Sequence, residues 1–301
     1  MATTTSLTTT YAGEVAGGYI QAAFLAQETI NNITFKTNVA YKQVVRRITD
    51  NATAFSGQTC DFTPTGTVTL NERVLTLVPM ALQRQLCKTT FYTDWEALAA
   101  QNGDINSVSD ALTITMAGLI GQINETMIWQ GTAGTGSYAG FETLLLADAS
   151  VINVASPVAI TASNVVAKIG ELVADCPLRV RRATERPKIY VASDVAEAYR
   201  IAMATLGNGD FHFAGQAISM TWLGQYDIVE CPGMSDSTMV MAQASNLWFG
   251  TNLGENWTSI EVIDMQPVSG DKTVRFSADF WGACQYGFGN EIVLYHLDNA
   301  E

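Results

Sequence analysis

Two histidines are the first candidates for chemistry in this sequence, because a neutral imidazole can act as a base near neutral pH and is a common metal ligand. They are His212 and His296. Neither has a His, Asp or Glu partner at the spacing by which one face of a helix holds a metal ion. His212 lies in a segment flanked by glycines, 209–215, which we expect to be a loop. We therefore predict packing or capping roles for both histidines.

The five cysteines are the second candidates. They are scattered along the chain, odd in number and never spaced as C-x-x-C. This pattern argues against a zinc site and against a disulfide framework. We predict reduced thiols in a cytoplasmic protein, at positions Cys60, Cys87, Cys176, Cys231 and Cys284.

Sequence motifs of catalysis and of nucleotide binding are absent. HExxH, GxSxG and Walker A do not occur. Residues 134–139 match a GxGxxA pattern, yet they follow a predicted helix, whereas a dinucleotide fingerprint follows a strand and opens a helix. We interpret them as a turn that needs the positive φ of glycine. The sequence predicts no catalytic, cofactor-binding or metal-binding residue, although 29 acidic residues leave open a carboxylate pair that meets only in space.

The composition is apolar and poor in charge. Hydrophobic residues make up 48% of the chain and charged residues only 15%, with a net charge of −13, whereas a typical soluble domain is about a quarter charged. The surface is therefore either covered by neighbouring subunits or neutral and polar. An acidic chain does not bind nucleic acid tightly over a broad face, because phosphates must be neutralised by Lys and Arg. With no charged-then-apolar leader and no apolar run of about 20 residues, we expect neither export nor residence in a membrane.

One cluster of basic residues stands out, Arg179, Arg181 and Arg182, with Arg186 and Lys188 shortly after it. One interpretation is a solvated edge of a strand. The other is a contact with acidic residues of a neighbouring subunit.

The elements that must carry these residues begin with a threonine-rich terminus, 1–10, and a predicted helix over 11–31. Strands are predicted over 39–45 and 65–75, where polar and apolar residues alternate, and they flank a polar stretch. Together they predict a long hairpin-like excursion that has no core of its own. A helix is predicted over 107–130, about 36 Å long at 1.5 Å per residue, ending at Gly131.

An α/β stretch and a long strand complete the prediction. Helices are expected over 163–174 and 193–205, and strands over 188–191, 218–222, 226–230 and 238–242. From position 274 to 288 the even positions are almost all apolar or small, and most of the odd ones are polar. This alternation predicts a long strand with one buried face.

This order of elements resembles the Hong Kong 97-type fold of tailed-phage major capsid proteins. The sequence words that carry the resemblance are TTYAGE (9–14), GYI (18–20), CDFTPTG (60–66), LNERVL (70–75), LCK (86–88), DWE (94–96) and GF (140–141). The resemblance covers nearly the whole chain. It implies an α+β, Hong Kong 97-like chain with an N-terminal arm (1–35), an extended β-hairpin loop (36–88), a peripheral domain with a long spine helix (89–140 and 245–301) and an axial α/β domain (141–244).

The resemblance implies a shell subunit without catalysis or cofactor, which assembles with copies of itself into pentamers and hexamers of an icosahedral head around double-stranded DNA. The implied location is the virion, after assembly in the host bacterial cytoplasm. Implied partners are a portal protein and scaffolding or decoration proteins. With only about 35 residues ahead of the loop, a separate scaffolding protein or none is expected, and no covalent cross-link is predicted. The residues expected to contact neighbouring subunits are Lys42, Arg46, Arg47, Glu72, Arg73, Arg179, Arg181 and Arg182.

Two alternatives remain open at this stage. A cellular nanocompartment shell of the same fold would enclose an enzyme in place of a genome, and neighbouring genes would separate the two. An α/β enzyme with an unrecognised site would be a monomer or small oligomer with a concave pocket of convergent polar groups.

Overall fold

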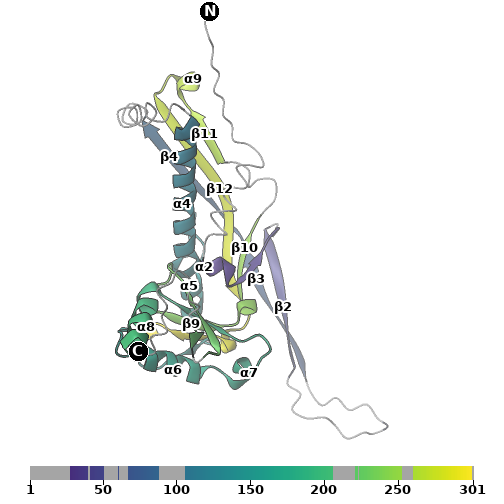
Figure 1. The fold of residues 1–301 in the computed structure, drawn as a ribbon. Helices are drawn as coiled ribbons and strands as arrows, with labels where there is room; N and C mark the ends of the chain where they lie inside the picture. Colours follow the sequence, from purple (N-terminus) through teal and green to yellow (C-terminus); the bar gives the residue numbers. More distant parts are fainter. Residues whose placement is uncertain are drawn as a thin grey trace, which may run out of the picture.

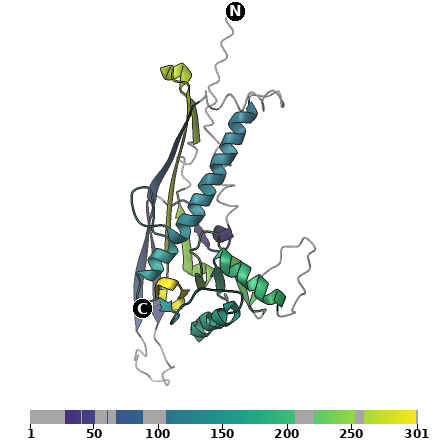
Figure 2. The same ribbon diagram turned by 90° about the vertical axis from the view of Figure 1, so that its left-hand side faces the viewer.

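The computed structural model describes residues 28–39, 41–50, 60, 67–87, 106–205, 221–222, 224–252 and 260–299. In these residues a long helix lies along a long sheet, a compact α/β unit lies at one end of both, and a two-stranded hairpin projects beside them (Figures 1 and 2). Most of the predicted helix over 11–31 and His212 lie outside the described residues. Of the predicted helix, the four residues of α2 (Glu28–Asn31) are described as helical.

The long sheet is organised around strand β12 (Thr273–Tyr286). One edge of β12 pairs antiparallel with β4 (Val78–Cys87), and the other pairs with β11 (Ile260–Asp264) and β10 (Leu247–Thr251) one after the other. Strand β1 (Thr34–Lys36) adds to β10 in parallel. The predicted alternation of β12 is confirmed, because the described even positions from 276 to 286 are all buried.

The predicted helix over 107–130 is confirmed as α4 (Asn106–Gln130), which spans about 37 Å at 1.5 Å per residue. It lies along the face of the long sheet (Figure 2). The chain then folds back across the end of the helix, where Gly140 N–H donates to the Gly131 carbonyl at 2.8 Å. A Cβ on Gly140 would lie 2.3 Å from the Trp129 carbonyl oxygen, so this close approach requires glycine. The predicted positive φ is found in the same turn, at Gly136 with φ of 73°.

The compact unit contains a six-stranded sheet in the order β5–β13–β9–β6–β8–β7. The predicted strands and helices of this stretch are confirmed, with the first three residues of the segment 218–222 outside the described part. The strands are β5 (Ile152–Asn153), β6 (Lys188–Val191), β7 (Thr221–Trp222), β8 (Tyr226–Glu230), β9 (Met239–Ala242) and β13 (Val293–Tyr295). The α-helices are α5 (Phe141–Leu146), α6 (Val165–Asp175), α7 (Leu178–Arg181) and α8 (Ser193–Thr205). The described residues also include α9 (Gln266–Ser269) and 3-10 turns at Ala244–Asn246, Gly289–Glu291 and Leu297–Asn299.

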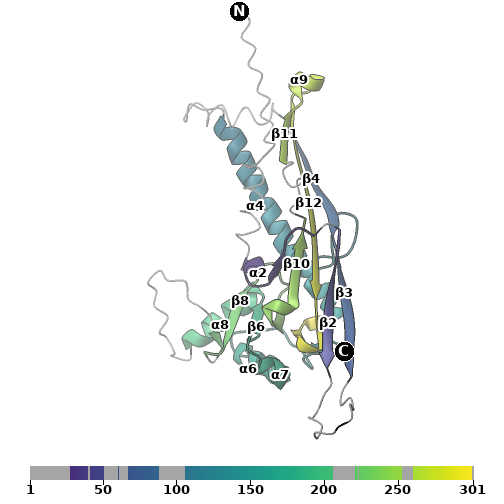
Figure 3. The same cartoon turned by 90° about the vertical axis from the view of Figure 1, so that its right-hand side faces the viewer.

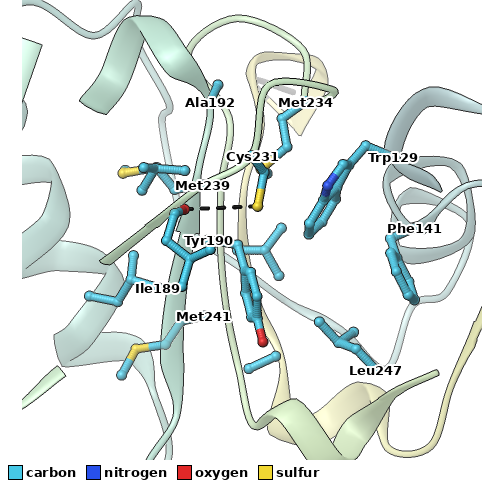
Figure 4. Packing of buried hydrophobic residues seen from close by; sticks show 14 of the residues in the cluster. Trp129, Phe141, Ile189, Tyr190, Ala192, Cys231, Met234, Met239, Met241 and Leu247 are labelled. Carbon is cyan, nitrogen blue, oxygen red and sulfur yellow. Dashed lines mark hydrogen bonds between the residues drawn. The ribbon is translucent and has the colours of Figure 1, made fainter. Parts of the chain in front are cut away.

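One hydrophobic cluster joins the two sheets. Trp129, at the end of α4, packs against Phe141 and against Tyr190 of β6, with ring centroids 5.4 and 5.8 Å apart (Figure 4). Cys231 and Met234 extend the same cluster. Because the spine helix and the six-stranded sheet share one core, we expect them to move as one body.

The hairpin consists of β2 (Lys42–Asp50) and β3 (Val68–Thr76), paired antiparallel over their whole length. This confirms the predicted two-stranded excursion. It runs out beside the compact unit (Figures 1 and 3). Strand β4 follows at once after Leu77 and belongs to the long sheet, although it lies inside the range 36–88 expected for the loop.

Two expectations differ from the structure. The cluster of arginines does not lie at the edge of a strand: Arg179 and Arg181 belong to the one-turn helix α7, which begins after Pro177 and whose first turn is closed by hydrogen bonds to the Pro177 carbonyl. Strand β13, grouped by sequence with the peripheral segment 245–301, pairs with β9 and β5 of the compact unit.

Candidate inter-subunit surface

One face of the hairpin carries an apolar stripe. In an antiparallel pair, residues opposite one another point to the same side. The register places Val44 opposite Val74 and Ile48 opposite Leu70 on one face, together with Val68. Ile48 is 68% exposed and Leu70 is 67% exposed. We call Val44, Ile48, Val68, Leu70 and Val74 the hairpin stripe.

An exposed stripe of this kind is unusual on a strand pair. A two-stranded ribbon is marginally stable in water unless its apolar face is covered. Within the described residues, every side chain from position 68 to 72 of β3 is exposed. The hairpin stripe therefore requires a cover from outside the described residues.

Charged residues lie on the same face as the stripe. Arg46 and Glu72 are directly opposite one another between the two apolar pairs, and Lys42 lies nearer the root. All three side chains are exposed. Arg47 lies on the opposite face by the register, and its side chain lies outside the described part of the structure.

The root of the hairpin is packed into the body. Leu75 and Leu77 are buried in a small cluster with Val39 and Ala283. A Cβ on Gly250 would lie 2.3 Å from the Leu75 Cδ2 atom, so a glycine of β10 makes room for this side chain. Apolar packing therefore holds the root of the hairpin. Towards the tip, Leu75 is the last side chain of β3 that is buried.

Arg73, two residues from Leu75 towards the tip of the hairpin, attaches the hairpin to the body by polar contacts. Its guanidinium lies 2.5 Å from the Asp148 carboxylate and 4.3 Å over the ring of Tyr286. The hydroxyl of Tyr286 and the backbone N–H of Ser150 also donate to Asp148. These donors, the Tyr286 hydroxyl first, hold the pKa of Asp148 well below its usual range, and burial raises the pKa of Tyr286 to about 12.

The other predicted contact residues lie on α7 (Arg179 and Arg181) and directly after it (Arg182). Arg179 forms an ion pair with Glu291 of the same chain. Arg181 is half-buried, and among the described residues its Nε has no hydrogen-bond acceptor. Arg182 is exposed. Of the eight predicted contact residues, Arg73 and Arg179 are bound within the chain, while Lys42, Arg46, Glu72 and Arg182 are exposed to solvent. Contact with a neighbour stays a prediction for all eight.

A buried polar cluster at His296 has the residue types of a hydrolytic triad. The Ser235 hydroxyl donates to Glu142 Oε2 at 2.8 Å and lies 3.2 Å from His296 Nε2. However, His296 Nδ1 accepts the backbone N–H of Asp298, so the ring proton is on Nε2. His296 therefore donates to the serine and does not act as its base, and the arrangement stabilises the fold rather than activating a nucleophile. This matches the capping role predicted for His296.

A second buried carboxyl, Glu125, lies between α4 and α2. Thr29 donates to Glu125 Oε1 through its hydroxyl, and the Trp129 indole donates to the same hydroxyl at 2.9 Å. Within the described part of the chain, Glu125 Oε2 has no hydrogen-bond partner, and burial raises the pKa of the carboxyl. The cluster fastens α2 to the spine helix.

Within the described ranges, no group of three or more His, Cys, Asp or Glu side chains is placed to hold a metal ion. No helix in the same ranges is long and apolar enough to cross a bilayer. Among the described side chains the cysteines are free thiols, with Cys60 exposed and Cys176, Cys231 and Cys284 buried.

The sequence alone misses the site in two respects. Alternation over 65–75 predicts a half-exposed strand, yet it does not say that the apolar side is the exposed one. Asp148 and Tyr286, which bind Arg73, lie 75 and 213 positions away from it, and no local pattern marks them.

No protein-family model and no curated protein matches this sequence. Several solved structures, however, are similar to this chain. The chain is similar to the capsid of a native GTA particle (15% identity, TM-score 0.57, 89% of this chain and 94% of that one) and to Gordonia phage Cozz (11%, 0.59, 89% and 86%). It is also similar to a virus-like particle from Pyrococcus furiosus (7%, 0.52, 94% and 98%).

These similarities cover nearly all of each chain, so they define the fold as a whole. The fold is that of a viral capsid shell subunit. More particularly, the chain has the α+β, Hong Kong 97-like fold of phage major capsid proteins, as the resemblance predicted.

Proposed function

We propose that this protein is the major capsid protein of a tailed bacteriophage. Copies of it form pentamers and hexamers, which assemble into an icosahedral head around double-stranded DNA. The subunit is structural, without catalysis or cofactor. It is built into the virion after assembly in the host cytoplasm.

The observation that carries the proposal is the hairpin stripe on a chain of capsid fold. Ile48 and Leu70 are about two-thirds exposed in the single subunit, and a neighbouring subunit is the cover that a self-assembling shell supplies. Extended strands that project from one copy and pack on the next give contacts that close into rings. The low charged fraction of 15% suits a surface that is largely buried between subunits.

The chain divides, in this proposal, into an N-terminal arm (1–35), an extended loop (36–88), a peripheral domain (89–140 and 245–301) and an axial domain (141–244). The pairing of β13 with β9 and β5 favours counting Val293–Tyr295 with the axial domain. Of the predicted contact residues, the exposed Lys42, Arg46, Glu72 and Arg182 are the ones we expect at the rim of an interface.

DNA is enclosed without being tightly bound, because a net charge of −13 repels phosphates. Portal, scaffolding and decoration proteins are the further partners that a phage head would add. Their contacts are expected on surfaces outside the hairpin stripe.

A nanocompartment shell is the second candidate. The observation that favours this second candidate is the similarity to the Pyrococcus furiosus virus-like particle, at a TM-score of 0.52. The two are separated by the contents of the particle and by the neighbouring genes, portal and terminase or a cargo enzyme.

Negative-stain electron microscopy of the purified protein, produced alone and with a candidate scaffold, tests the proposal. Closed shells, rings of five or six, or open sheets would support it. A uniformly small monomer under both conditions would overturn it.

A further inference from the structure

The attachment of the hairpin to its own body has two parts of different character. At the root, Leu75 and Leu77 are fully packed between Val39 and Ala283. Further out, the contact to the body is polar, through Arg73. Beyond Arg73, from Glu72 to Val68, every side chain of β3 is exposed. The root acts as a pivot, and beyond it Arg73 is the first residue of β3 whose side chain binds the body.

The polar contact is a closed cluster of three side chains. The Arg73 guanidinium lies against the Asp148 carboxylate and over the Tyr286 ring, and the Tyr286 hydroxyl donates to the same carboxylate. Asp148 itself is fixed to the body by the backbone N–H of Ser150 at 2.9 Å. A second link, from the Gln285 amide to the Val74 carbonyl, is long at 3.3 Å. Charge-assisted contacts therefore dominate this attachment.

A cavity of about 480 Å³ lies beside the cluster, between the hairpin and the body. Val45 and Asn71 line it from the hairpin, and Trp248 and Asn290 line it from the body. Close packing would hold the hairpin at one angle, because packed interiors do not deform continuously. An unfilled space on this side leaves room for the hairpin to swing about its root.

We propose that Arg73, Asp148 and Tyr286 form a latch that sets the angle at which the hairpin leaves the body, and that the subunit changes this angle by opening the latch. This inference rests on the proposed function, because the angle has a role only where the hairpin stripe contacts another copy. One subunit could then present the stripe at different angles in different ring environments without a change in its core.

The chemistry of the latch determines how it opens. Hydrogen bonds, that of the Tyr286 hydroxyl first, hold the pKa of Asp148 well below its usual range, so the carboxylate is ionised at neutral pH. Protonation is therefore not the trigger. The half-exposed Arg73 side chain is open to competition from a neighbouring subunit and to screening by salt.

The latch is tested in the dissociated full-length subunit by the distance between two spin labels. One label is placed on the hairpin (Thr69→Cys) and one on the body (Glu197→Cys), both at exposed positions. Cys60 and Cys87 are replaced by Ser. The three remaining thiols are buried, and burial raises their pKa values, so they do not compete for the label.

We expect a narrow distance distribution in the parent and a broad one after Arg73→Ala or Asp148→Asn. The Asn side chain can still accept the Ser150 N–H, so this variant removes the charge with little change in the local packing. Tyr286→Phe, which keeps the buried ring, should broaden the distribution less. Arg84→Ala serves as the matched control, because Arg84 is an exposed arginine of β4 whose guanidinium donates to the neighbouring Gln83 carbonyl.

Distributions as narrow as the parent's in both Arg73→Ala and Asp148→Asn, with folding confirmed by circular dichroism, would overturn the latch. The measurement needs no assembly. Failure of the parent to form shells would count against the proposed function, whereas an unchanged distance distribution would count against the latch alone.

Discussion

Replacing Ile48 and Leu70 by Thr should abolish or strongly weaken assembly while leaving the subunit folded. Thr is β-branched and keeps the strand propensity of the hairpin, so the change acts on the apolar surface rather than on the strand. Both side chains lie on one face of the hairpin and are exposed in the single subunit. Each substitution should therefore change the free energy of unfolding by no more than about 0.5 kcal/mol.

The magnitude follows from the exposed fractions. Burying a Leu or Ile that was fully exposed is worth about 1.5–3 kcal/mol. At exposures of 68% and 67%, each side chain would contribute about 1–2 kcal/mol when a neighbour covers it. The pair then contributes at least about 2 kcal/mol per subunit, which corresponds to about a 30-fold rise in the critical concentration for assembly, since each 1.4 kcal/mol is a factor of ten.

The assay is light scattering and electron microscopy over a dilution series of parent and variant subunits. The matched control is Gln43→Thr with Asn71→Thr, which places the same new residue at two exposed positions of the same strands but on the opposite face. The control should assemble at the parent's concentration. If the stripe variant also assembles there, the hairpin stripe is not the surface that a neighbour covers, and the central argument for the proposed function is lost.

Three further predictions concern the fold. Gly140→Ala should lower the free energy of unfolding by about 1–3 kcal/mol, because its Cβ would lie 2.3 Å from the Trp129 carbonyl oxygen. Gly118→Ala should raise the free energy of unfolding by about 0.5–1 kcal/mol, because Gly118 lies in open space on α4 and Ala favours a helix. Urea unfolding measures both effects. Glu125→Gln should stabilise the protein at neutral pH relative to the parent, because burial raises the pKa of Glu125 and the folded state disfavours the ionised form. Ser235→Ala should cost about 1–3 kcal/mol, measured by thermal unfolding, because a buried carboxylate oxygen loses its donor.

The pH dependence gives the Glu125 prediction its sign. Above the unfolded-state pKa of about 4.3, the folded protein binds more protons at this site than the unfolded chain, so the parent loses stability as pH rises toward the raised pKa. The advantage of Glu125→Gln should therefore grow over that range and vanish in acid. A constant difference across pH would show that the carboxyl does not titrate between the two states. For the glycine pair, equal effects of the two substitutions would contradict the steric argument.

Much of the fold follows from local patterns in the sequence. The strict alternation over 274–288 leads to β12, and the helical spacing of apolar residues over 107–130 leads to α4, within one residue at its start. Both patterns work because side-chain direction has a fixed period in each kind of backbone. Helix α7, which carries Arg179 and Arg181, could not be predicted in this way, because a single turn of helix is too short to show a period.

The sequence does not predict which distant strands pair with one another. Strand β4 lies within the range expected for the loop, yet it pairs with β12 almost 200 positions later, and β13 joins the other sheet. Which strands meet depends on the long-range burial of their faces and not on their own composition. The same holds for the cluster of Ser235, Glu142 and His296, whose members come from three separate segments.

By itself, the sequence determined the elements, their order and the absence of known catalytic motifs, because these depend on neighbours within a few residues. The tertiary structure decided which face of the hairpin is bare and what holds Arg73. Leu75 and Leu70 are both apolar residues of one strand, but only Leu75 meets a glycine of β10 that makes room for it. Leu70 extends beyond the body of its own subunit. Exposure is a property of what lies opposite a side chain, and only the folded chain supplies that.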